Sequence, residues 1–144
     1  MSVSIVGLAA LNKSLSDYSK RFEKETVRAV NVTANNVRNN AIRSIKQHSA
    51  GETYEKYRPR RTHTASAPGD APNTDTGRLI NSITVDKSSA VKPTAEVIAG
   101  AEYATWLEFG TTNMEARPFM FPALEKERPE YEKRIREIPK KALK

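Results

Sequence analysis

The sequence predicts an α+β protein with a long N-terminal helix, a short antiparallel β-sheet, short helices and a C-terminal helix. Apolar residues recur at helical spacing over the first third of the chain, two strand-like segments flank a proline-containing turn, and a charged helical segment follows near the end. The chain has 144 residues, which is the usual length of one domain. We therefore expect a single domain over residues 1–144.

The N-terminal third is expected to form a helix over residues 8–48. Its apolar residues follow one another at steps of three, four or eight and draw one stripe along the helix: Leu11, Leu15, Tyr18, Phe22, Val30, Ala34, Val37, Ala41 and Ile45. About forty helical residues span about 60 Å, twice the diameter of a small domain, so part of the helix must reach beyond its own core. A projecting helix indicates a partner surface on another chain. Asparagines and β-branched residues leave open a break or kink near residues 31–36.

Residues 49–76 are expected to form a flexible loop rich in proline and arginine, because glycines and prolines bar a regular helix or a central strand. Its middle carries four cations and no acid between residues 56 and 61: Lys56, Arg58, Arg60 and Arg61. The helix before it is also free of acidic residues from position 26 to the loop. Such a loop fits contact with DNA phosphate or an acidic partner, and it equally fits a solvated surface.

Shorter elements are expected over residues 77–124. Asp75 or Thr76 serves as the N-cap of a short helix that reaches Ile83. Strands over residues 83–87 and 95–100 then form a β-hairpin whose edges require another strand or a neighbouring subunit. A helical turn over residues 101–111 follows, closed by Gly110.

The last element is expected to be a charged helix and tail over residues 122–144. Pro122 is a favourable first helical residue. Pro129 is expected to kink or restart the helix, and Pro139 to end it before a basic tail.

Several short motifs stand out in order along the chain: Ala67 to Pro72, Asp75 to Leu79, Leu107 to Thr111 and Ala116 to Leu124. Their combination, DTGRL with LEFGT and ARPFMFPAL, resembles a family of morphogenesis proteins of long-tailed bacteriophages and prophages, over nearly the whole chain. The resemblance implies a head-to-tail joining or tail-completion protein. Such proteins form rings, commonly of six subunits, around the channel where the tail meets the neck.

The same resemblance implies partners and a location. The partners are further copies of the chain and other neck or tail proteins, with transient contact to DNA in the channel and none to a membrane. The location is the neck or tail of a virion assembled in the bacterial cytoplasm. No cofactor is implied.

The candidate subunit interface consists of residues in the two aromatic motifs: Trp106, Glu108, Phe109, Arg117, Phe119 and Phe121. Packing into the core is the simplest role for these aromatic residues, with an interface as the alternative. Glu108 lies between two apolar residues, and we expect it either to be solvated or to pair with Arg78 or Arg117, in the same chain or across a subunit boundary.

Composition favours a binding role over catalysis. The chain carries 24 Lys plus Arg against 17 Asp plus Glu, a net charge of +7, and contains no cysteine. A disulfide framework and thiolate chemistry are thus excluded, and a reducing compartment fits. The two histidines form no HExxH pair and no nucleotide-binding glycine motif occurs, so no enzyme, metal or cofactor is expected. The alternative function is a basic nucleic-acid-binding module that uses the acid-free helix end and the arginine-rich loop.

Overall fold

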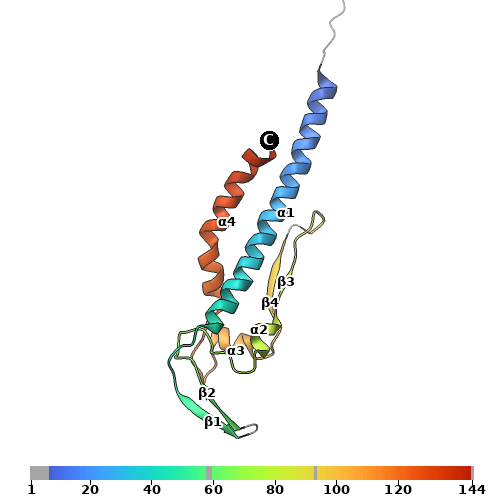
Figure 1. Ribbon diagram of the computed structural model, residues 1–144. Coiled ribbons are helices and arrows are strands. Elements are labelled where there is room, and N and C mark those ends of the chain that lie inside the picture. Colours follow the sequence, from blue (N-terminus) through green and yellow to red (C-terminus); the bar gives the residue numbers. More distant parts are fainter. Residues whose placement is uncertain (1–6, 58–59, 93, 144) are drawn as a thin grey trace, which may run out of the picture.

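The structure is a computed structural model that describes residues 7–57, 60–92 and 94–143, with only the backbone described at Arg61. Figure 1 shows two long helices side by side, a β-hairpin along one of them, and a second hairpin at the far end. The elements are α1 (Leu8–Lys46), β1 (Thr53–Tyr57), β2 (Arg60–Thr64), α2 (Arg78–Ser82), β3 (Ile83–Asp86), β4 (Glu96–Ala99), α3 (Ala104–Phe109) and α4 (Met120–Ala142). The α+β prediction is confirmed.

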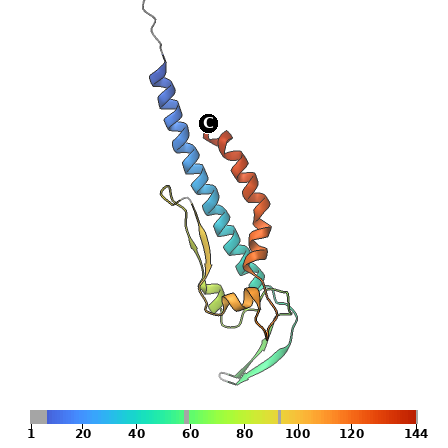
Figure 2. The same ribbon diagram turned by 180° about the vertical axis from the view of Figure 1, so that it is seen from behind.

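The helix α1 is the central element of the fold. In Figures 1 and 2, α4 runs antiparallel to α1 on one side, and the β3–β4 hairpin lies along the other. The two helices differ in length: α1 has 39 residues and α4 has 23. At a rise of about 1.5 Å per residue, α1 is about 24 Å longer than α4 and extends past its end.

The core lies where the C-terminal half of α1 meets α2, α3, β3 and the start of α4. It is built from Val37, Ala41, Ile45, Leu79, Ile83, Ala101, Ala104, Phe119 and Ala123. Ile45, Ile83 and Phe119 are its largest fully buried side chains. The small alanines let the helix backbones approach closely, so these three side chains fill the space that remains.

The asparagine-rich middle of α1 continues as an unbroken helix, so the break left open by the sequence does not occur. The polar side chains there bind neighbouring elements. Asn31 Nδ2 donates to Ser88 O (2.9 Å), and Ser88 N–H donates back to Asn31 Oδ1 (2.7 Å). Asn36 Nδ2 donates to Glu127 Oε1 on α4 (2.8 Å), and Arg38 Nε donates to Ile83 O on β3 (2.8 Å). These tertiary bonds offset a low intrinsic helix propensity.

An ion pair on α4, between buried Glu127 and half-buried Arg134, lies at the α1–α4 interface. Arg134 Nη1 lies 2.6 Å from Glu127 Oε1 and also donates to Thr33 Oγ1 at 3.1 Å. Glu127 is buried, and Asn36 supplies its second hydrogen bond. The Glu127 carboxylate is therefore bound by Asn36 of α1 and by Arg134 of α4, and these bonds fix the register of the two helices.

The β3–β4 hairpin is antiparallel, as predicted, and pairs Ile83 with Ala99 and Asp86 with Glu96. Lys92, in the connection between the strands, donates to Asp86 Oδ2 (2.7 Å). This hydrogen bond, and then contact with Glu96, raises the pKa of Lys92 above its ordinary value. The hairpin is closed at one end by this lysine and attached to α1 by Asn31.

The segment expected to be a flexible loop, residues 49–76, contains the β1–β2 hairpin. Thr53 pairs with Thr64 and Tyr57 with Arg60. Threonine and tyrosine are enriched in strands, and here they outweigh the surrounding glycines and prolines. Arg58 and Pro59, between the strands, lie outside the described residues.

Two helix ends differ from expectation. The N-cap of α2 is Gly77 rather than Asp75 or Thr76, although Arg78 N–H donates weakly to Thr76 Oγ1 (3.4 Å). Helix α4 begins at Met120, two residues before Pro122, and continues through both Pro129 and Pro139. Each proline lacks a backbone N–H and so removes one hydrogen bond from the helix. At Pro139 the loss of that one bond does not end the helix, which continues for three more residues to Ala142.

Candidate assembly surface

Glu108 on α3 organises the start of α4. Its carboxylate accepts backbone hydrogen bonds from Phe119 (2.9 Å), Met120 (3.0 Å) and Phe121 (2.8 Å). The first four N–H groups of a helix lack partners within the helix, and the fourth position here is Pro122, which has no N–H. Glu108 thus satisfies every free donor at this helix end, and its negative charge also suits the helix dipole.

Within the described part of the chain, neither Arg78 nor Arg117 forms an ion pair with Glu108, so the expected pair is not made inside one protomer; a pair across a subunit boundary stays a prediction. Arg117 instead joins two other segments of the chain by hydrogen bonds to their backbone carbonyls. Its N–H donates to Leu107 O (2.7 Å) and its Nε donates to Ser66 O (3.2 Å). Glu108 is half-buried, and its carboxylate accepts hydrogen bonds from three backbone amides rather than from water alone.

The glycine in LEFGT makes this return of the chain possible. Gly110 ends α3 with φ 75°, a conformation that side chains other than glycine rarely adopt. A Cβ there would lie 2.8 Å from Met114 O and 2.9 Å from Ala116 N. The close approach lets the chain reverse over residues 111–114 and deliver Phe119 to the Glu108 carboxylate.

The candidate interface residues fall into two groups. Phe119 is core, with 1% of its surface exposed, and Arg117 is half-buried. Trp106, Phe109 and Phe121 are 58%, 79% and 63% exposed. A core position is therefore wrong for these three aromatic residues, which form what we call the aromatic patch. Exposed aromatic side chains of this size favour contact with another protein.

An apolar groove of about 900 Å³ begins at Phe109 and Phe121 of the aromatic patch. Its sides come from α1, β4, α3 and α4; residues that line it include Val30, Val97, Phe109, Phe121, Leu124 and Tyr131. Three charged residues line it: Glu108 accepts the backbone hydrogen bonds described above, and Arg128 and Glu132 are paired with Glu125 and Arg136 on α4. The groove thus presents an apolar interior whose rim charges already have partners.

A second uncovered apolar surface lies on the N-terminal half of α1. Leu8, Leu11 and Leu15 are 59%, 56% and 57% exposed, and we call them the leucine stripe. Tyr18 and Phe22 continue it one turn at a time, with ring centroids 6.1 Å apart. The stripe lies on the part of α1 that extends beyond the end of α4 (Figure 1).

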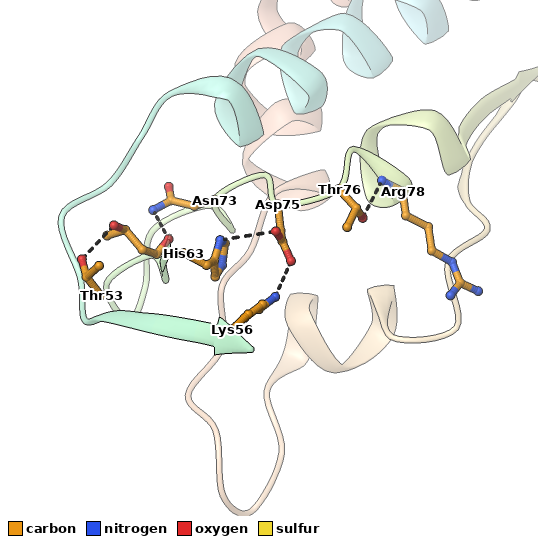
Figure 3. Close-up of polar contacts among 8 residues, drawn as sticks. Thr53, Lys56, His63, Asn73, Asp75, Thr76 and Arg78 are labelled. Atoms are coloured by element: carbon orange, nitrogen blue, oxygen red, sulfur yellow. Dashed lines mark hydrogen bonds and ion pairs between the residues drawn. The ribbon is translucent and has the colours of Figure 1, made fainter. Parts of the chain in front are cut away.

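Three of the four loop cations belong to the strands of the β1–β2 hairpin: Lys56 to β1, and Arg60 and Arg61 to β2. Figure 3 shows Lys56 and His63 directed toward Asp75, which forms an ion pair with Lys56 and lies 3.9 Å from His63 Nδ1. Arg60 Nη2 lies 3.6 Å from Glu55 Oε2. Arg58 and the side chain of Arg61 lie outside the described residues. Two of the four cations therefore face acidic groups of the same chain.

The hairpin is attached to the loop before α2 through the motif DTGRL. Asp75 binds Lys56, and Asn73 Nδ2 donates to Thr64 O (3.0 Å) and to Ser49 O (2.8 Å). Arg78 extends away from this cluster (Figure 3). The aspartate of the motif thus orients a projecting hairpin.

The comparison with protein families identifies the family of the chain. A family model, HK97-gp10-like, described as "Bacteriophage HK97-gp10, putative tail-component", matches residues 9–110. The chain belongs to the HK97-gp10-like family. Neither a curated protein nor a solved structure matches the chain.

The HK97-gp10-like match covers α1, both hairpins, α2, α3 and the motifs DTGRL and LEFG. Residues 111–144 lie outside it, among them Phe119, Phe121 and all of α4. One wall of the apolar groove therefore belongs to the matched region and the opposite wall, on α4, does not. The Glu108 carboxylate joins the two parts.

Other kinds of site are not evident in this HK97-gp10-like protein. The described residues include no group of three or more His, Cys, Asp or Glu placed to hold a metal ion. Within the same residues, no helix combines the length and apolar character that a membrane crossing requires.

The groove was missed in sequence reasoning because its residues come from four separate elements. Val30, Val97 and Leu124 each look like ordinary core positions when read alone. The uncovered leucine stripe did have a signal, since a helix of about forty residues exceeds the size of a small core.

Proposed function

We propose that this protein is a structural subunit of the phage neck or tail, which forms a closed ring and joins head to tail or completes the tail end. The observation that carries the proposal is the pair of uncovered apolar surfaces on one protomer, the leucine stripe and the aromatic patch with its groove. Membership of a tail-component family supports a place in the virion.

Two surfaces at different places on one chain suit a ring. A head-to-tail contact between unlike surfaces repeats around an axis, and it closes when the rotation between neighbours allows. Ring size follows from that rotation, and six subunits is the number that the family resemblance implies. We also propose that residues 1–144 act as one domain, because α1 packs against both α4 and the β3–β4 hairpin.

A second candidate function is binding of nucleic acid by the β1–β2 hairpin. The hairpin projects from the rest of the molecule (Figure 1), and Tyr57 on it is 79% exposed. However, Lys56 faces Asp75 and Arg60 faces Glu55, which reduces the charge available for phosphate. This distribution supports a structural role of the hairpin over DNA retention.

The test is the solution mass of the purified protein by light scattering, at low and moderate salt, with and without duplex DNA. A discrete oligomer near six subunits whose mass ignores DNA is the expected result. A monomer that shifts strongly onto DNA at low salt would instead establish the nucleic-acid module, because phosphate contacts weaken steeply with salt. A protein that stays monomeric and ignores DNA would contradict both.

Matched variants separate the two surfaces. Trp106→Ala should reduce assembly and leave the protomer folded, because this side chain is largely exposed. The triple change of Arg58, Arg60 and Arg61 to Ala should leave assembly intact. Loss of DNA retention in the triple variant, with wild-type retention in Trp106→Ala, would favour the nucleic-acid module.

A further inference from the structure

The leucine stripe has the spacing of a helix that binds in a groove. Leu8, Leu11 and Leu15 stand at positions i, i+3 and i+7, the anchor pattern of such helices. Lys13, Asp17 and Lys20 fall on the opposite face by the 100° step of the helix. The stripe can therefore enter an apolar surface without burying a charge, whose desolvation would be costly.

The groove matches the stripe in length and chemistry. It follows α4 from Met120 to Glu132, which is about 18 Å, and the stripe with its extension from Leu8 to Phe22 is about 21 Å long. The groove lining is mostly apolar, and its three charged residues all have partners on α4: Arg128 and Glu132 in ion pairs, and Glu108 in hydrogen bonds to the first backbone amides. Leu124 and Phe121 on its wall are exposed and lack a cover in the described part of the chain.

The stripe cannot reach the groove of its own chain. Both lie on α1, because Val30, Ala34 and Val37 of the same helix line the groove, and α1 is continuous between them. Figures 1 and 2 show α1 as a single rod, so its N-terminal end points away from α3. The helix that fills the groove must come from another molecule.

Pairing of two stripes in a coiled coil fits less well. The exposed stripe covers only about two heptads, whereas coiled coils sustain their repeat over about three or four. Such a symmetric contact would also leave the groove empty and would join two copies rather than build a ring.

We infer that the leucine stripe of one copy inserts into the apolar groove of the next copy, between β4 and α4. This inference rests on the proposed ring and names the contact that builds it. Each protomer then offers one helix and one groove, so the contact is head-to-tail and repeats until the ring closes.

The test uses two full-length variants that each lose one side of the contact. The helix variant carries Leu11→Lys and Leu15→Lys, and the groove variant carries Leu124→Glu and Tyr131→Glu. These four side chains are exposed, so the helix content measured by circular dichroism should match that of wild type, while the thermal midpoint should fall to that of an unassembled protomer. The control is Leu143→Lys, a leucine outside both surfaces that is 74% exposed, which should assemble as wild type does.

Each variant alone should be a monomer by light scattering and native mass spectrometry, which is a complete loss of the oligomer. Mixed in equal amounts, they should form a one-to-one heterodimer and nothing larger. The groove variant still has its helix and the helix variant still has its groove, so exactly one contact remains for each pair.

Two outcomes would overturn the inference in different ways. If wild type is oligomeric and either the groove variant still assembles or the mixture gives no heterodimer, the helix–groove contact is wrong while the ring proposal stands. If wild type and the Leu143→Lys control are monomeric up to the highest attainable concentration, the ring proposal itself fails, and the inference fails with it.

Discussion

The two halves of α1 share one backbone and one apolar stripe, but they have different surroundings. In the C-terminal half, Ala34, Val37, Ala41 and Ile45 are buried against α4, the hairpin and the short helices. In the N-terminal half, Leu8, Leu11 and Leu15 remain more than half exposed. Side-chain type does not explain the difference, since the exposed residues are the larger apolar ones. The difference arises because α4 ends at Ala142 and leaves the rest of α1 without a partner.

An apolar stripe on a helix shows that the helix needs a covering surface. It does not show whether that surface belongs to the same chain or to another one. Burial of a leucine stabilises by about 1.5–3 kcal/mol wherever the covering surface comes from. In one half of α1 that energy is gained during folding of the protomer. In the other half we propose that it is gained during assembly.

The largest expected effect is in the packed half. Ile45→Ala should lower the free energy of unfolding by about 3 kcal/mol, because it opens a cavity around a residue with no exposed surface. Urea denaturation followed by circular dichroism measures the change. A loss below about 1 kcal/mol would mean that packing around Ile45 stabilises the protomer little more than the contacts of the exposed half do.

The next effect concerns the residue that starts α4 and so gives the packed half its partner. Glu108→Ala should cost about 2 kcal/mol, since three backbone amides lose a charged acceptor. Glu108→Gln keeps one acceptor oxygen and should lose less, as measured by the same denaturation. Equal losses in the two variants would argue against the capping role.

A smaller effect is expected in the middle of α1. Asn31→Ala should cost about 1 kcal/mol, because it removes two hydrogen bonds to the backbone of buried Ser88. Asn39→Ala is the matched control: Asn39 is exposed and forms no side-chain hydrogen bond within the described residues. The control should gain about 0.5 kcal/mol from helix propensity. If the thermal midpoints of Asn31→Ala and Asn39→Ala shifted by the same amount, the stabilising role of the Asn31–Ser88 hydrogen bonds would be contradicted.

The smallest effect is expected in the exposed half. Leu15→Ala should change the free energy of unfolding of the protomer by less than about 0.5 kcal/mol, because the side chain lacks a tertiary partner. Hydrogen exchange under dilute, unassembled conditions should show faster exchange of amides 12–22 than of amides 34–45. Equal protection along α1 would show that its two halves do not differ in stability.

Most elements of the fold were predictable from local chemistry. The apolar spacing predicted α1, the β-branched segments predicted β3 and β4, and Gly110 predicted the end of α3. The β1–β2 hairpin was not predicted, because prolines and glycines dominate residues 49–76 and its strand-forming residues are few. The predicted end of α4 at Pro139 was wrong, because a proline near the end of a helix removes only one hydrogen bond.

The candidate site was predictable only in part. The motifs LEFGT and ARPFMFPAL contain the residues of the aromatic patch, and Trp106, Phe109 and Phe121 were named as interface candidates. Their exposure could not be derived, because Phe119 has the same chemistry and lies in the core. Which aromatic side chain faces inward depends on the path of the backbone after α3. That path is set by the turn at Gly110 and by the hydrogen bonds of Glu108 to the start of α4.

The sequence alone determined the α+β class, the excess length of the first helix and the family, because these follow from periodicity and from motifs read in order. Only the tertiary structure decided which part of that helix is covered, what Glu108 binds and where the groove opens. Periodicity acts within one element, whereas coverage depends on how far α4 extends beside α1 and on where chain segments distant in sequence meet.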